Sequence, residues 1–206
     1  MSTDRSTRSE ARERLLGTAG ELFYGEGIRA VGVDRLVSEA RVTRATFYRH
    51  FPSKEDLVLA YLRGADEQVR DGVRAAAGST ATAGDALRAI AASIDDDLAR
   101  PGFRGCAFLR AVAEFPDPAD PVHQAVVAHR TWFVGALEEM FTSVYRDEGP
   151  GARPGRAARH FLMLRDGAMS AAAIDATDDI GDTFRRGVEG LITVVHSPGT
   201  RPHLPS

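Results

Sequence analysis

The chain has 206 residues, of which 43% are hydrophobic and 27% charged, and its formal net charge is −3 at pH 7. This composition is ordinary for a soluble globular protein, and no apolar run approaches the roughly 18 to 20 residues that span a bilayer. The first fifteen residues alternate acids and bases without an apolar core, so we do not expect them to form a secretory signal. The lone Cys106 is compatible with a reducing compartment, so we expect a cytoplasmic protein with no membrane partner.

The charges are distributed unevenly along the chain. Residues 1–64 carry 11 Lys and Arg against 9 Asp and Glu, whereas the remainder carries 15 against 20. A mildly basic head on an acidic body fits a protein in which only the N-terminal part meets phosphate.

Apolar residues recur with a helical period from the start of the chain. One stripe of a first helix consists of Leu15, Leu16, Ala19, Leu22 and Phe23. Ser6 or Ser9 is the expected cap of this helix, and Gly25 and Gly27 mark its end. Two short helices follow at about 33–40 and 43–50. Ser53 then caps a fourth helix that runs to about residue 77, with two acidic residues in its first turn.

Five further helices are expected, at about 84–100, 106–115, 122–146, 156–174 and 182–195. Turns rich in proline and glycine separate several of them, above all residues 116–121 and 149–155. Runs of alternating β-branched residues are absent, so the sequence predicts an all-α fold.

The two short helices have the spacing of a helix-turn-helix, in which the first helix braces a second that lies in the major groove. Residues 41–43 join them, and their small core consists of Leu36, Val37, Ala40, Val42 and Phe47. Thr43 is placed to cap the second helix. The alternative is a short amphipathic helix whose polar residues are merely solvated.

Polar residues of the second helix are the candidate DNA contacts. Arg44 can donate to O6 and N7 of guanine, and Thr46 offers a hydroxyl and a methyl group to base edges. Tyr48, His50 and Lys54 are placed to hold phosphates of the flanking backbone. We therefore assign sequence choice to Arg44.

This segment resembles the N-terminal domain of TetR-type (TetR/AcrR) transcriptional regulators. The matching residues are 40–43 (Ala-Arg-Val-Thr), 45–51 (Ala-Thr-Phe-Tyr-Arg-His-Phe) and 53–57 (Ser-Lys-Glu-Asp-Leu), in register and without gaps. The resemblance covers about residues 11–62. It implies that Tyr48, His50 and Lys54 contact phosphate and that the region from Thr43 to Phe47 faces bases.

Three residues depart from the family pattern. Gly32 stands where a capping threonine is usual, and Ala45 replaces a glycine of the recognition helix. Arg41 replaces the usual turn glycine, which would cost on the order of 1 kcal/mol if the position requires a positive φ.

The resemblance further implies a division into a DNA-binding domain (1–51), a helical ligand-binding and dimerisation domain (52–196) and a tail (197–206) that we expect to be disordered. An aromatic and sulfur cluster suits an adaptable apolar site for a small apolar or amphipathic ligand. Its candidate residues are Phe103, Cys106, Phe108, Leu109, Trp132, Phe133 and Met163. The alternative is that these residues are ordinary core. Arg104, Glu114, His123 or His129 are polar groups that could orient a ligand.

The last two helices are the candidates for a dimer interface. Their apolar faces contribute Leu162, Met169, Phe184, Val188, Leu191 and Val195. The family resemblance implies a four-helix interface in a homodimer, and packing within one chain is the alternative.

The sequence thus favours a homodimeric DNA-binding regulator, a repressor that a small molecule releases from its double-stranded operator, without cofactor or metal. A first alternative is a thiol-responsive repressor that uses Cys106. A second is a helical enzyme, although no phosphate-binding loop, metal-spaced Cys/His pair or nucleophile elbow is present. A third is an architectural DNA protein without sequence preference, which the acidic body disfavours.

Overall fold

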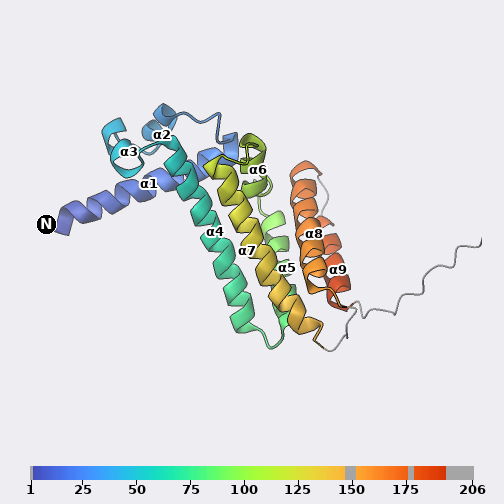
Figure 1. Cartoon of the computed structure of the whole chain (residues 1–206). Coiled ribbons are helices and arrows are strands. Elements are labelled where there is room, and N and C mark those ends of the chain that lie inside the picture. The colour runs from blue at the N-terminus through green and yellow to red at the C-terminus, as the bar shows by residue number, and fades with distance from the viewer. Residues whose placement is uncertain (1, 147–151, 176–178, 194–206) are drawn as a thin grey trace, which may run out of the picture. The chain divides into compact units, whose positions relative to one another are not determined.

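A computed structural model describes residues 2–146, 152–175 and 179–193, and within these ranges the chain forms helices and no strand. The helices are α1 (Ser2–Glu26), α2 (Val33–Glu39), α3 (Arg44–His50), α4 (Lys54–Ser79), α5 (Ala83–Leu98), α6 (Ala107–Glu114), α7 (Pro121–Val144), α8 (Pro154–Ile174) and α9 (Ile180–Thr193) (Figure 1). The predicted all-α fold is confirmed, and each expected helix is present within a few residues of its predicted ends, apart from the start of α1.

The chain divides into two compact units. Unit 1 consists of residues 1–70 and 104–129, and unit 2 consists of residues 71–103 and 130–206. Helices α4 and α7 contribute to both units, so the division does not follow the helix order. The functional boundary after residue 51 stays a prediction, and the expected tail 197–206 lies outside the described residues.

In unit 1, α1, α2 and α3 pack on one another around apolar side chains. Leu15, Ala19 and Phe23 of α1 are buried, as their helical spacing predicts, and the Phe23 ring meets Tyr61 of α4 edge-on. The expected cap of α1 was wrong, because the helix begins at Ser2 and therefore includes Ser6 and Ser9. Its predicted end is confirmed.

The end of α2 has the hydrogen bonds of a Schellman motif. The amide of Val42 donates to the carbonyl of Val37 at 3.0 Å, and the amide of Arg41 donates to that of Ser38 at 3.2 Å. This motif places one residue in the left-handed region, which is usually glycine. Arg41 occupies this position with a φ of 51°. The positive φ that the sequence analysis named as the condition for backbone strain at Arg41 is therefore present.

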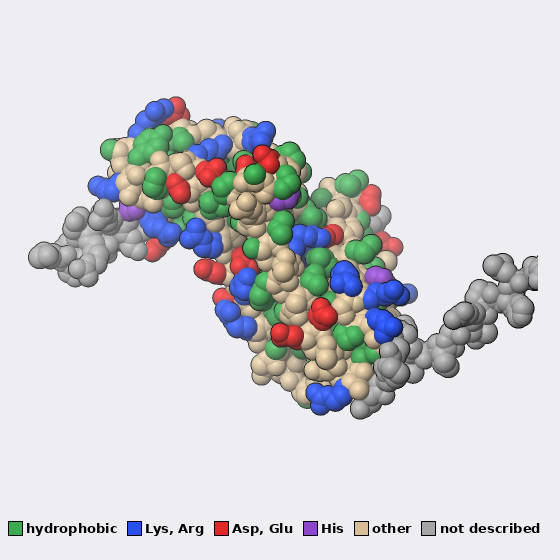
Figure 2. Space-filling model, viewed as in Figure 1, with side chains coloured by type: hydrophobic (Ala, Val, Ile, Leu, Met, Phe, Trp, Pro, Cys, Tyr) green, Lys and Arg blue, Asp and Glu red, His purple; other side chains and the backbone are tan. Residues whose placement is uncertain are grey.

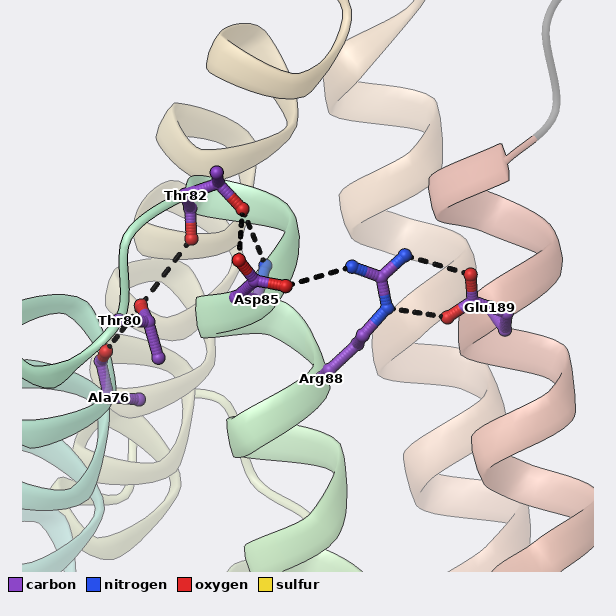
Figure 3. A network of polar contacts seen from close by, with 6 residues as sticks. All are labelled: Ala76, Thr80, Thr82, Asp85, Arg88 and Glu189. Carbon is purple, nitrogen blue, oxygen red and sulfur yellow. Dashed lines mark hydrogen bonds and ion pairs between the residues drawn. The ribbon is translucent and has the colours of Figure 1, made fainter.

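In unit 2, α5, α8 and α9 pack on one another. Phe161 of α8 meets Phe184 of α9 edge-on at 5.6 Å between ring centroids. Thr82 caps α5 by accepting from the amide of Asp85, and Arg88 of α5 donates to both carboxylate oxygens of Glu189 of α9 at 2.7 and 2.8 Å (Figure 3). The Phe161 and Phe184 rings thus join α8 to α9, and an exposed ion pair joins α5 to α9.

Basic and acidic side chains are interspersed on the face of the molecule shown in Figure 2. Among the described residues, no helix is both long enough and apolar enough to cross a membrane.

Candidate nucleic-acid interface

The predicted helix-turn-helix is formed by α2, a four-residue turn and α3. Thr43 is the N-cap of α3, and its hydroxyl accepts from the amide of Thr46 at 3.1 Å. Phe47 anchors the helix from its inner side, with none of its surface exposed. Burying a side chain of this size stabilises the fold by about 1.5–3 kcal/mol, so the orientation of α3 is fixed by its core side.

Burial corrects one predicted DNA contact. Phe47 was placed among the DNA-facing residues, but a fully buried ring cannot reach a base edge. Its contacts are instead aromatic, with the Tyr48 ring at 5.1 Å and the Phe51 ring at 6.2 Å between centroids. Phe47 therefore positions the recognition helix.

The outward side of α3, which we call the outer face, consists of Arg44, Ala45, Tyr48 and Arg49, all exposed. Arg49 was not predicted as a contact from the sequence, although its place four residues after the exposed Ala45 puts it on this face. Thr46 and His50 are half-buried at its edges, and the Thr46 hydroxyl lies 3.0 Å from that of Thr43. The outer face thus offers two guanidinium groups and one phenol to a ligand.

The Lys54 ammonium, which the sequence predicts as a phosphate contact, already has a hydrogen-bond partner within the protein. Its ammonium donates to the carbonyl of Ile28 at 2.6 Å, and the side chain is half-buried. Burial lowers the pKa of the Lys54 ammonium, and the nearby Glu114 carboxylate partly opposes that shift. An ammonium has three donors, so the predicted phosphate contact stays open beside this internal one.

Gly32 is the N-cap of α2 and provides no side-chain hydrogen bond there. The side-chain cap that the usual threonine would provide is therefore absent from the start of α2, as the sequence predicts. The amide of Leu36 still donates to the Gly32 carbonyl at 3.2 Å, so the helix forms without the side-chain cap.

Helix α6 is hydrogen-bonded at both ends to the end of α1 and the turn that follows it. The Glu114 carboxylate accepts from the amides of Ile28 and Arg29 at 2.9 and 2.6 Å. At the other end of α6, the Tyr24 hydroxyl accepts from the amide of Arg104 and donates to the carbonyl of Gly105. We call these four bonds the α6 clamp. The sequence did not reveal it, because its partners are 80 to 86 residues apart.

The predicted ligand-binding residues fall into both units. In unit 1, Cys106 and Phe108 are buried, Leu109 is half-buried, and the Phe108 ring stacks on His129 at 3.7 Å. The buried His129 lies 2.7 Å from a carboxylate oxygen of Asp66 of α4. Of the four polar groups that the sequence offers for orienting a ligand, His129 thus contacts one of the predicted aromatic residues, Phe108.

In unit 2, Trp132 lies beside Phe133, and Phe133 meets Phe161 at 6.3 Å between centroids. The guanidinium of the buried Arg165 lies 5.5 Å from the centroid of the Phe133 ring. Phe103 is half-buried. The prediction that Met163 belongs to this cluster is wrong, because Met163 is 69% exposed.

Comparison with known proteins identifies the same segment. Residues 15–61 match the family model described as bacterial regulatory proteins, tetR family. The fold is similar to the crystal structure of a TetR-family transcriptional regulator from Streptomyces coelicolor, with 54% sequence identity and a TM-score of 0.83. That match covers 89% of this chain and 95% of the other.

Curated relatives are DNA-binding regulators as well. The HTH-type transcriptional regulator YjdC of Escherichia coli is 23% identical over 88% of this chain and 93% of its own length. The HTH-type transcriptional activator FasR of Mycolicibacterium smegmatis is 36% identical over 45% of this chain. The match spans only 42% of FasR. These relatives are transcriptional regulators and not enzymes.

Proposed function

The chain belongs to the TetR family of DNA-binding transcriptional regulators, and from this premise we propose that it is a homodimeric repressor that a small molecule releases from its operator. The observation that carries the proposal is the outer face of α3. It exposes Arg44, Tyr48 and Arg49 on a helix whose opposite side is held by the buried Phe47. A rigid helix with an exposed basic face suits insertion into the major groove.

Base reading is assigned to Arg44, the first residue of α3. N-terminal residues of a recognition helix are the ones that contact base edges, and a guanidinium matches O6 and N7 of guanine. Tyr48, Arg49 and Lys54 are assigned to the phosphate backbone. The predicted contacts from Thr43, Thr46 and His50 remain part of the proposal, as an N-terminal cap, an edge contact and a flanking contact.

Selection of duplexes from a random library, followed by competition at matched salt, tests this function. We expect one enriched sequence with two half-sites, and an affinity for it at least about 1,000-fold above random DNA. Arg44→Ala should reduce discrimination between sequences, whereas Tyr48→Phe and Lys54→Ala should weaken binding to all sequences alike. Equal affinity of the wild type for selected and random duplexes would contradict the proposal.

The proposed dimer interface uses α8 and α9 but not all of the predicted residues. Leu162, Met169, Phe184 and Val188 are already buried within one chain, and Val195 lies outside the described residues. These four side chains therefore support the packing of α8 on α9, and direct contact with a partner falls to their exposed neighbours.

The exposed neighbours on α8 form a continuous face. Met163, Gly167, Ser170 and Ile174 are exposed at helical spacing, with Ile174 at 80%, and Leu191 of α9 is half-exposed. Exposed apolar side chains at both ends of this face, with small residues between them that permit close approach, suit a helical dimer interface. Met163→Asp should convert the dimer to a monomer in analytical ultracentrifugation, whereas Val127→Asp on α7 serves as a matched control.

The proposed ligand is small and apolar or amphipathic, and each unit offers one group of the predicted aromatic residues as a candidate site for it. Support comes from the stacked Phe108 and His129 of unit 1 and from the Trp132 and Phe133 pair of unit 2. The thiol-responsive alternative is weakened because Cys106 is buried and a reactive thiol requires access. Native mass spectrometry of the purified protein, before and after organic extraction, tests for a bound molecule.

Release from DNA is proposed to run through α4 and α6. A displacement of α6 would act on the turn after α1 through the α6 clamp, and α4 carries Lys54 and begins directly after the recognition helix. Half-sites lie about 34 to 36 Å apart on one DNA face, so a few ångströms of change would remove much of the specific affinity. Crystals with and without ligand that show the same spacing of the two recognition helices would contradict this route.

A further inference from the structure

Arg44 is not free on the outer face of α3. Its Nε donates to Oδ1 of Asp34 at 2.7 Å, and its Nη2 contacts the same oxygen. Asp34 lies in the first turn of α2, ten residues earlier in the sequence. The pair therefore joins the bracing helix to the first residue of the recognition helix.

The contact uses one particular edge of the guanidinium. Arginine has five N–H donors in a rigid planar fork, and the edge formed by Nε and Nη2 faces Asp34. The edge formed by Nη1 and Nη2 retains two parallel donors. Two parallel donors are what recognition of guanine O6 and N7 requires.

Both side chains remain accessible, since Arg44 is 62% and Asp34 75% exposed. An exposed pair of this kind contributes little to folding, because water screens it. The hydrogen bond to Asp34 and the charge of its carboxylate do raise the pKa of Arg44. The pair is therefore better suited to orienting a side chain than to stabilising the protein.

We propose that Asp34 is the positioning residue that holds Arg44 with its free edge directed at a guanine, and that Asp34 thereby sets the sequence specificity of the recognition helix. This inference rests on the proposed DNA-binding function. Restricting the long Arg44 side chain to one orientation before binding reduces the entropy that is lost on complex formation.

The charge of Asp34 has a second consequence for specificity. Its carboxylate compensates the Arg44 guanidinium, so that Arg44 adds little to the general attraction between the outer face and phosphates. Without Asp34, the flexible guanidinium is free to bind phosphates of any sequence. Loss of Asp34 should therefore lower the affinity for the operator and raise the affinity for random DNA.

The test is selection of duplexes by full-length wild type and by Asp34→Asn, Asp34→Ala and Arg44→Ala. We expect wild type to prefer G·C at one position of each half-site, and the two Asp34 variants to lose about five-fold or more of that preference. Arg44→Ala should lose the preference at the same position, and adding Asp34→Asn to it should change the profile no further.

Glu39→Gln is the matched control. It also removes one negative charge from α2, where Glu39 pairs with Arg35 rather than with a residue of α3. Its base preferences should equal those of wild type. The binding of Asp34→Asn to random duplex should show a salt slope steeper by about one ion, which a purely structural role of Asp34 would not produce.

Two results overturn the inference in distinguishable ways. If wild type enriches an operator and the Asp34 variants enrich it with the same preference at every position, Asp34 does not position Arg44, while the proposed function stands. If wild type enriches no sequence, the proposed function fails and this inference fails with it.

Discussion

Replacing Arg41 with glycine is expected to stabilise the protein. Arg41 occupies the left-handed position of the Schellman motif at the end of α2, with φ of 51°. A side chain with a Cβ atom is strained there because Cβ approaches the following carbonyl oxygen, whereas glycine adopts this conformation freely. The Arg41 side chain is exposed, so its removal creates no cavity.

The size of the effect follows from two opposing contributions. Relief of the left-handed strain is worth about 1–2 kcal/mol. Glycine loses more conformational entropy on folding than other residues do, which costs about 0.5–1 kcal/mol. The midpoints of these two ranges give a net gain in the free energy of unfolding of about 0.75 kcal/mol, which raises the Tm by about 1.5–3 °C for a chain of this length.

Urea and thermal unfolding followed by circular dichroism measure this gain. Arg41→Ala is the matched control, since it removes the same charge and keeps the Cβ atom, and we expect its stability to remain at or below that of wild type. A stabilisation of equal size in both variants would refute the backbone argument, because the effect would then come from the arginine side chain. No stabilisation by glycine would refute it as well.

Three other substitutions test contacts within the two units. Glu114→Gln should destabilise the protein by about 1–3 kcal/mol in urea unfolding, because an amide cannot accept from two backbone amides of the α6 clamp as the carboxylate does. Burial alone would raise the pKa of Asp66, but hydrogen bonds from His129 and Arg70 outweigh it and hold that pKa below its ordinary value. The ionised carboxylate therefore stabilises the fold above its unfolded pKa, and this contribution is lost as the pH falls through the lowered folded value. Asp66→Asn should accordingly lower the free energy of unfolding by about 1.5–3 kcal/mol at pH 7. Below about pH 4 the stabilities of the variant and of wild type should converge, because wild type loses this contribution there. A constant difference at all pH values would contradict this. Glu189→Gln should change stability by less than about 1 kcal/mol, because the pair it forms with α5 is nearly half-exposed.

The helices were predictable from the sequence because their signals are local. The buried stripe of α1, the Thr43 cap and the Ser53 start of α4 each depend on residues within one or two turns of one another. The start of α1 was misplaced for a physical reason: serines that suit a cap are also tolerated inside a helix, and nothing in the sequence forces the choice.

The parts of the site that were not predictable depend on contacts between distant residues. Asp34 reaches Arg44 only because the turn between α2 and α3 brings them together, and Glu114 reaches the turn after α1 from 86 residues away. Phe47 shows a different difficulty. A family pattern indicates which region faces DNA, but it does not indicate which side chain of a short helix is buried in the core, as Phe47 is.

The bond between Lys54 and the Ile28 carbonyl has a practical consequence. Lys54 is the one lysine in the sequence, so reagents that modify side-chain amines have a single target residue. That amine is half-buried and hydrogen-bonded beside the recognition helix. The rate at which a small reagent acylates Lys54 therefore reports on the structure around this amine without an engineered label. We expect local opening to raise the rate and bound DNA that covers the amine to lower it.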